Sequence, residues 1–160
     1  MKKFLHFFLW SVLCISARGD EKIPLGKFTG TWKSDCIAFE KPAICRTTWS
    51  VGLAKSSMLV QEYSFSDSNN GTELFRGRGL YKIDGNSVSG HWEDSANNVY
   101  SLSGSIENHV ISVNWGEINN GGRSRYDFSG GKFHAVDWAL RPSGWYEFMN
   151  VEYGDSVAEQ

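Results

Sequence analysis

The amino-acid sequence predicts an all-β protein, an up-and-down antiparallel meander of about ten strands that closes into a barrel. Three observations favour this fold class. Short segments of alternating apolar and polar residues recur along the chain, turn clusters rich in Gly, Asn and Asp separate them, and no stretch after Asp20 keeps a capped helical period. Closure into a barrel is expected because it removes the exposed edges of a long meander.

The N-terminal segment has the features of an export signal. Lys2 and Lys3 form a basic start, residues 4–15 are apolar, and residues 17–19 (Ala-Arg-Gly) provide a small-x-small cleavage site. The apolar run is shorter than the roughly 20 residues that a membrane-spanning helix needs. A cleaved signal peptide is therefore predicted, with an uncleaved anchor or a lipid-modified Cys14 as the alternatives.

Cleavage leaves residues 20–160 as a single β-barrel domain behind the signal peptide at residues 1–19. No internal repeat, Pro-rich linker or low-complexity run divides this length, which is close to that of one typical domain. The whole chain has 16 basic and 18 acidic residues, and the signal removes some of the basic ones. The mature protein is thus acidic and expected to be periplasmic or secreted, with no nucleic-acid partner and no integral membrane segment.

The predicted strands follow one another at short intervals. Turn clusters such as residues 67–71, 84–86 and 119–122 lie between them, and their Gly and Asn residues tolerate the positive φ of tight hairpins. Consecutive hairpins without a crossover helix give an up-and-down order. The strands are expected at residues 30–39, 46–53, 57–66, 72–83, 87–94, 99–107, 110–117, 122–129, 132–141 and 144–153.

Alternation with a period of two then assigns the faces of the strands. Gly77 and Gly79 share the aromatic face of the fourth strand, where they would permit a bend or a bulge. The pattern predicts an apolar interior and leaves open whether it is filled or hollow. The faces expected to form it carry Phe75, Tyr81 and Ile83 in the fourth strand, Ile111, Val113 and Trp115 in the seventh, and His134, Val136, Trp138 and Leu140 in the ninth.

Cys36 and Cys45 are the cysteines of the mature chain, and we expect them to form a disulfide. An even pair in an exported chain, with Pro42 turning the segment between them, is typical of a bridge that closes a loop after the first strand. Without CxxC spacing or a nearby histidine, they are not expected to form a zinc or redox site.

The segment Gly30-Thr31-Trp32 resembles the GxW that opens the first strand of calycins, the superfamily of lipocalins, fatty-acid-binding proteins and avidins. Nearly the whole mature chain is similar, in the order and spacing of short glycine-aromatic motifs, to a bacterial family of calycin-like domains of unknown function that resembles nitrobindin in fold. The resemblance implies a calycin-like barrel. Its motifs lie in residues 49–65, 79–84, 90–95, 102–104 and 145–153.

No catalytic motif, nucleotide loop or metal-ligand cluster is evident, so the functional prediction depends on the barrel interior. We expect non-covalent binding of a small hydrophobic or aromatic molecule. One alternative is an isomerase, cyclase or hydrolase acting on a lipid-like or aromatic substrate in the same pocket, and another is an interaction domain with a filled core. The predicted ligand-binding residues are Trp92, Trp115, Tyr126, His134 and Trp138.

No metal site or obligatory cofactor is expected, with haem as a minor alternative. The resemblance to nitrobindin implies that a histidine directed into the barrel, here His134, could ligate haem iron. The other interpretation is a hydrogen-bonded histidine in an apolar wall. Arg123 and Arg125 likewise either grip an anion from an inward face or form outward pairs across strands.

Overall fold

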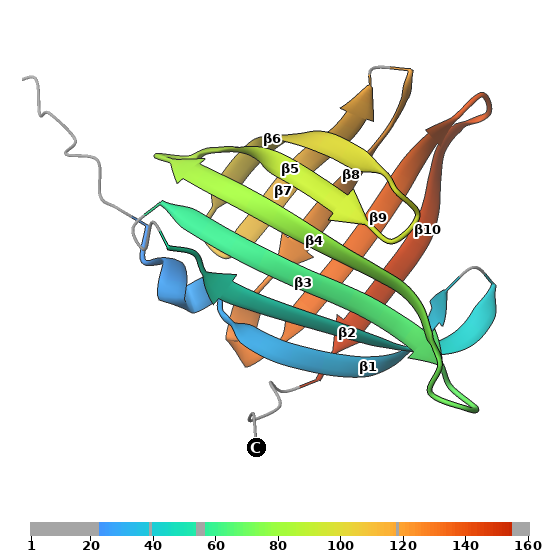
Figure 1. Ribbon diagram of the computed structural model, residues 1–160. Coiled ribbons are helices and arrows are strands. Elements are labelled where there is room, and N and C mark those ends of the chain that lie inside the picture. The colour runs from blue at the N-terminus through green and yellow to red at the C-terminus, as the bar shows by residue number, and fades with distance from the viewer. Residues whose placement is uncertain (1–22, 39, 54–56, 118, 155–160) are drawn as a thin grey trace, which may run out of the picture.

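The computed structural model describes residues 23–38, 40–53, 57–117 and 119–154. Within them, ten antiparallel strands form one sheet in which each strand pairs with its neighbours in chain order (Figure 1). The predicted all-β meander is confirmed. The predicted signal peptide at residues 1–19 lies outside the described residues.

The strand positions agree closely with the prediction, with two differences. The eighth strand, β8 (Asn120–Asp127), lies two residues earlier than the predicted range of 122–129, and the second strand starts earlier than expected. β2 begins at Lys41, well before residue 46, because Ala38 already pairs with Lys41 and the left-handed Glu40 (φ 65°) makes the turn tight. Two 3-10 turns, η1 (Leu25–Phe28) and η2 (Ser129–Gly131), complete the fold. The strands are β1 Gly30–Ala38, β2 Lys41–Val51, β3 Met58–Asp67, β4 Glu73–Asp84, β5 Ser87–Asp94, β6 Val99–Glu107, β7 Val110–Glu117, β8 Asn120–Asp127, β9 Phe133–Arg141 and β10 Gly144–Tyr153.

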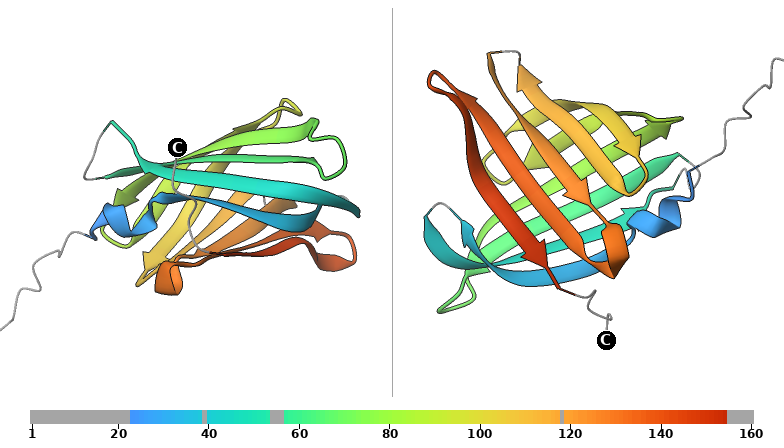
Figure 2. Two further views of the ribbon diagram at one scale, coloured as in Figure 1. Left: turned by 90° about the horizontal axis from the view of Figure 1, so that it is seen from below. Right: turned by 180° about the vertical axis from the view of Figure 1, so that it is seen from behind.

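The sheet curls until its first and last strands lie side by side, which gives a nearly closed barrel (Figure 2). β1 and β10 are not paired in the described ladder. The hydroxyl of Ser34 donates a hydrogen bond across this seam to the carbonyl oxygen of Glu152 at 3.2 Å. The barrel is therefore closed by packing and side-chain contacts at the seam rather than by a continuous ladder.

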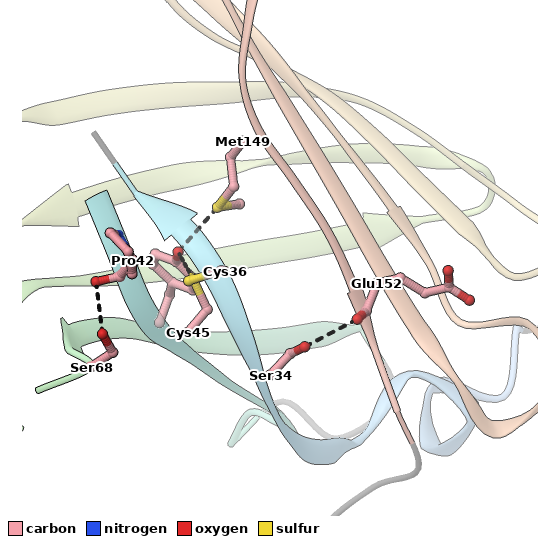
Figure 3. Close-up of a disulfide and its surroundings, with 8 residues drawn as sticks. Ser34, Cys36, Pro42, Cys45, Ser68, Met149 and Glu152 are labelled. Atoms are coloured by element: carbon pink, nitrogen blue, oxygen red, sulfur yellow. Dashed lines mark hydrogen bonds between the residues drawn. A yellow bond between two sulfur atoms is a disulfide. The ribbon is translucent and has the colours of Figure 1, made fainter. Parts of the chain in front are cut away.

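The predicted disulfide between Cys36 and Cys45 is present, with the two Cα atoms 5.9 Å apart (Figure 3). It joins two paired strands instead of closing a loop. Cys36 pairs with Ala43, and Cys45 pairs with Ser34, so the bridge runs diagonally across the β1–β2 ladder. It fixes the register of the first hairpin close to its turn.

One end of the barrel, which we call the closed end, is filled by aromatic rings. The rings of Trp49 and Phe128 pack edge to face with centroids 5.3 Å apart, and those of Trp32 and Phe133 stack at 5.1 Å. Phe28 of η1 is fully buried and reaches the ring of Phe128 at 5.2 Å. η1 lies at the opposite end of the barrel from the β1–β2 hairpin (Figure 1), so this turn plugs the closed end.

The predicted inward faces are confirmed in β4 and β7 and wrong in β9. In β9, Phe133 and Asp137 face the interior, whereas His134 and Trp138 lie on the outer face. The paired strand shows why: Tyr126 of β8 is buried and lies opposite Ala135. The prediction was wrong because the outer face of β9 has the more apolar sequence. Its Trp138 is covered by neighbouring side chains, whereas the inner face carries the acidic residue Asp137.

Candidate functional site

The half of the barrel opposite the closed end, which we call the open end, contains a cavity of about 860 Å³. Strands β1 and β3–β10 all contribute side chains to its wall, and most of these are apolar or aromatic. The volume lies within the range of roughly 300–1,000 Å³ that is common for small-molecule sites. The interior of this barrel is therefore filled at one end and hollow at the other.

The mouth of the cavity lies among the hairpins that contain the β1–β2, β3–β4 and β9–β10 turns. Ile37 and Leu74 line it although they are 60% and 50% exposed. A β-bulge in β10 between Glu147 and Met149 shifts the register there, so Phe148 and Met149 both line the cavity. Apolar side chains exposed around an opening are typical of a ligand entrance.

Two tryptophans lie flat against the cavity wall because the strand beneath each of them has a glycine. A Cβ atom at Gly77 would lie 2.0 Å from Cζ2 of Trp92, and one at Gly122 would lie 2.0 Å from Cζ2 of Trp115. These glycines make room for indoles, and the ladders of β4 keep their register at Gly77, so the predicted bulge is not observed there. The flat rings widen the cavity while keeping its wall aromatic.

Each of the two indole N–H groups has a hydrogen-bond acceptor in the structure. Nε1 of Trp92 donates to Oδ2 of Asp94 at 3.3 Å, and Nε1 of Trp115 donates to the hydroxyl oxygen of Ser124 at 3.1 Å. These bonds hold the rings in place from their polar edges. The ring faces are therefore held in fixed positions on the cavity wall.

The floor of the cavity is a polar layer on top of the closed-end rings. The Tyr81 hydroxyl donates a 2.6 Å hydrogen bond to Oε1 of Gln61, and Nε2 of Gln61 donates to the Thr47 hydroxyl at 3.5 Å. The rings of Tyr81 and Tyr126 lie 4.8 and 5.1 Å from that of Trp49. The same rings thus form the floor of the cavity and the upper surface of the core.

A buried carboxyl group, Asp137, lies in the wall near this floor. It faces Ser124 in the β8–β9 ladder and is 7% exposed. Burial raises the pKa of Asp137 to about 7, and a hydrogen bond from Ser124 opposes this rise in part. Burial also raises the pKa of Tyr63 and Tyr126, and the nearby charge of Asp137 adds to that rise. The protonation state of Asp137 therefore changes near neutral pH.

Tyr63 connects the cavity wall to the disulfide. Its hydroxyl donates a hydrogen bond to Sδ of Met149 at 3.0 Å and lies 3.2 Å from Sγ of the disulfide-bonded Cys45, which carries no proton. Met149 comes from β10 and Cys45 from β2. The contact therefore ties the seam strand to the bridged hairpin beside the cavity.

The structure brings together three of the predicted ligand-binding residues and separates two. Trp92, Trp115 and Tyr126 line the cavity. Nε2 of His134 instead lies 2.8 Å from Oδ1 of Asn150 in an exposed pair on the outer face.

Trp138, the other separated residue, also lies on the outer face. The guanidinium of Arg123 lies 4.7 Å from the centroid of the Trp138 ring and 4.7 Å from that of the Trp145 ring. Trp138 and Arg123 therefore pack against each other on the outer face. The two arginines thus point outward: Arg123 packs across strands against Trp138, and Arg125 pairs with Asp127 of its own strand at 2.9 Å instead of across strands.

The predicted ligand-binding residues omitted several polar side chains of the cavity, among them Gln61, Tyr63 and Asp137, and Tyr81 was predicted to face the interior but not to belong to the site. A signal for Asp137 was present in the alternation of β9, where it shares a face with Phe133 and Ala135. An acid between apolar residues in the middle of a strand face is unusual enough to indicate a site. It was missed because the opposite face carried more large apolar residues.

Haem and metal binding find little support in this geometry. His134 points away from the cavity and is not positioned to ligate iron bound there. Within the described ranges, no group of three or more His, Cys, Asp or Glu side chains is placed to hold a metal ion. The chemistry that the cavity offers is aromatic stacking, hydrogen bonding and one carboxyl group.

The architecture is consistent with a calycin-like barrel. No protein-family model matches the sequence, and no curated protein matches it. Membership of the bacterial calycin-like family therefore stays a prediction. Among the described residues, no helix has the length and apolar character needed to cross a membrane.

Proposed function

We propose that the protein binds a small hydrophobic or aromatic molecule non-covalently inside the barrel. The observation that carries this proposal is the cavity of about 860 Å³ with an aromatic wall and an apolar mouth. A protein that used the barrel for stability alone would gain by filling this volume, since interiors normally pack to crystal-like density. The closed end of the same barrel is filled in that way.

The arrangement of the wall favours a flat, apolar ligand. The indole faces of Trp92 and Trp115 are held against the wall, and the stacked rings of Phe65 and Phe75, with centroids 5.2 Å apart, continue the aromatic surface. Ring faces bind other rings and alkyl groups with little loss of side-chain entropy. Export to the periplasm or the cell exterior fits the disulfide, because such bridges persist in oxidising compartments.

The test is a titration with N-phenyl-1-naphthylamine, a neutral aromatic fluorescent probe. Binding in the cavity is expected to be saturable at micromolar concentration and to quench tryptophan emission. Ala139→Phe places a ring into the cavity and should weaken binding at least about tenfold, equivalent to about 1.4 kcal/mol. Leu140→Phe, on the outer side of the same strand, is the matched control and should leave the affinity unchanged.

Absence of saturable binding, or equal affinity in the two variants, would contradict the proposal. Native mass spectrometry of protein purified from expressing cells adds an independent measurement. A retained small molecule would show the class of ligand directly. Its loss in Ala139→Phe and retention in Leu140→Phe would locate it in the cavity.

The second candidate is an enzyme that uses the same cavity for an isomerase, cyclase or hydrolase reaction on a lipid-like or aromatic substrate. The observation that favours it is Asp137, a buried carboxyl whose pKa of about 7 suits a general acid or base. Extracts of expressing cells incubated with the protein would then yield a new product. Asp137→Asn should abolish that product while probe binding persists.

A further inference from the structure

The charges of the cavity are distributed unevenly between its mouth and its interior. Of the charged side chains that line the described cavity, Glu40 and Arg141 are exposed, and Asp94 lies at the β5–β6 turn. Asp94 accepts hydrogen bonds from the backbone N–H groups of Ala96 at 2.9 Å and Asn98 at 3.1 Å. Asp94 is therefore occupied in capping the turn.

The positively charged side chain among the described lining residues, Arg141, lies at the mouth and already has a partner. The guanidinium of Arg141 rests on the ring of Tyr146, 3.7 Å from its centroid. None of the ion pairs found among the described residues includes Asp137. Asp137 is thus a buried acidic group whose side chain faces neutral neighbours.

A buried carboxylate without a cation is costly, because desolvation favours its neutral form. The hydroxyl of Ser124 donates one hydrogen bond to Asp137, whereas an ionised carboxylate has about four acceptor positions. The remaining positions are available to a donor that enters the cavity. A ligand that brings a positive charge would satisfy more of them than a neutral donor.

The side chains around Asp137 also favour a positively charged ligand group. The rings of Tyr63, Tyr81, Tyr126 and Trp115 all line the cavity, and aromatic faces attract cations through the ring quadrupole. A carboxylate combined with several aromatic faces is the usual means of recognising an ammonium group. A ligand carboxylate, in contrast, would be repelled by Asp137 on the way to the floor.

We propose that the ligand is an apolar or aromatic amine, whose protonated nitrogen binds the Asp137 carboxylate while its apolar body lies between Trp92 and Trp115. This inference rests on the proposed function, because it needs the cavity to be a binding site. It adds the chemical class of the ligand. The single ion pair would orient the molecule with its charged end at the floor and its apolar body toward the mouth.

The test compares three probes with one ring system: 1-naphthylmethylamine, 1-naphthylmethanol and 1-naphthoic acid. Calorimetric titration at pH 8 should give the amine about tenfold higher affinity than the alcohol, and the acid the lowest affinity. Asp137→Asn should lower the affinity for the amine to that for the alcohol and leave the alcohol unchanged. Glu93→Gln, which removes an exposed carboxylate from the outer face of β5, is the matched control and should preserve the preference.

The pH dependence tests the proposal without any substitution. Because Asp137 ionises near pH 7, the preference for the amine over the alcohol should shrink at pH 5.5, where the amine is still protonated. The groups facing Asp137 do not titrate in this range, since burial raises their pKa values further above the ordinary value of a phenol. They are Tyr63 of β3, Tyr81 of β4, Tyr126 of β8 and Tyr153 of β10.

The outcomes separate this proposal from the proposed function. Equal binding of the amine and the alcohol, at both pH values, would overturn the amine class and leave the cavity as a site for neutral ligands. Tighter binding of the acid would overturn it as well. If none of the three probes binds while N-phenyl-1-naphthylamine does, the amine class is overturned and the proposed function stands. If N-phenyl-1-naphthylamine does not bind either, both proposals fail. Should Asp137→Asn not fold, the comparison of probes and pH values still decides the question.

Discussion

The two ends of this barrel use the same kinds of residue for different purposes. At the closed end, Trp49 is 1% exposed and its ring meets those of Tyr81, Tyr126 and Phe128 within 5.3 Å. At the open end, the Trp115 ring lies 5.4 Å from that of Tyr100 and 6.3 Å from that of Phe148, and it borders the cavity. Whether an aromatic strand residue stabilises the fold or lines a site depends on what fills the space opposite it.

The segments that connect the strands supply this difference. η1 and the β8–β9 connection bring Phe28 and Phe128 over the closed end, where the two rings meet. The open end is bounded by polar turns such as residues 67–72 and 94–98, whose side chains bond their own backbones. Phe28 and Phe128 therefore come from outside the strands and complete the ring cluster that Trp32, Trp49 and Phe133 form within them. Among the described residues, no connecting segment brings a comparable ring into the cavity at the open end.

The largest expected effect is on the stability of the closed end. Trp49→Ala removes a fully buried ring from a packed cluster and should lower the free energy of unfolding by about 3–5 kcal/mol. Trp115→Ala, the matched substitution at the open end, should cost about 1 kcal/mol of stability and instead weaken probe binding by about 2 kcal/mol, or thirtyfold. Urea unfolding and fluorescence titration measure the two effects. Equal losses of stability would show that the two ends are packed alike.

The meander could be predicted because its evidence is local. Turn residues and the period of two place each strand within a few positions, and β5, β6, β7 and β10 have the bounds expected. The inward face of β9 could not be predicted in this way. Alternation gives two faces but not which one is inside, and a cavity reverses the usual rule by placing Asp137 inward and Trp138 outward.

Large aromatic residues of the site could be predicted from the sequence, and its polar residues could not. Trp92 and Trp115 were predicted because large aromatic residues on inward faces are common in ligand sites. Tyr81 was predicted to face the interior, but its role in the floor and that of Gln61 were not predicted, because both depend on a hydrogen bond between neighbouring strands, which no local pattern records. The emptiness of the cavity depends on the whole barrel, and no single segment encodes it.

The second effect is the dependence of the free energy of unfolding on pH, which we expect from the buried carboxyl group of Asp137 in the cavity wall. Burial raises the pKa of Asp137 from 3.8 to about 7, so the folded state binds the proton more tightly than the unfolded state does. This contribution to stability is fully present below about pH 4 and is lost as pH rises through 7, by on the order of 2–4 kcal/mol. Urea unfolding of the native protein and Asp137→Asn at pH 5 and pH 8 isolates it. The native protein should lose more stability than the variant between these values, and parallel changes would contradict the assignment.

The third effect tests whether the disulfide compensates for the missing plug at the open end. Replacing both Cys36 and Cys45 with Ser releases the constraint on the β1–β2 hairpin and should lower the free energy of unfolding by about 2–3 kcal/mol. Thiol titration of the unfolded, unreduced protein lacking residues 1–19 should first find no free thiol. Two free thiols, or a double variant as stable as the native protein, would show that the bridge does not support this end.

The smallest expected effect comes from the outer face and decides the orientation of β9. Trp138 packs against the guanidinium of Arg123 on that face, and such cation–π contacts contribute about 0.5–1 kcal/mol. Trp138→Ala should therefore cost about 1 kcal/mol of stability and leave the affinity for N-phenyl-1-naphthylamine unchanged, because the ring does not border the cavity. His134→Ala should leave the affinity unchanged for the same reason. The opposite result would be a tenfold loss of affinity in Trp138→Ala together with an unchanged affinity in Trp115→Ala. It would mean that Trp138 faces the cavity and that the inward face of β9 is the one predicted from the sequence.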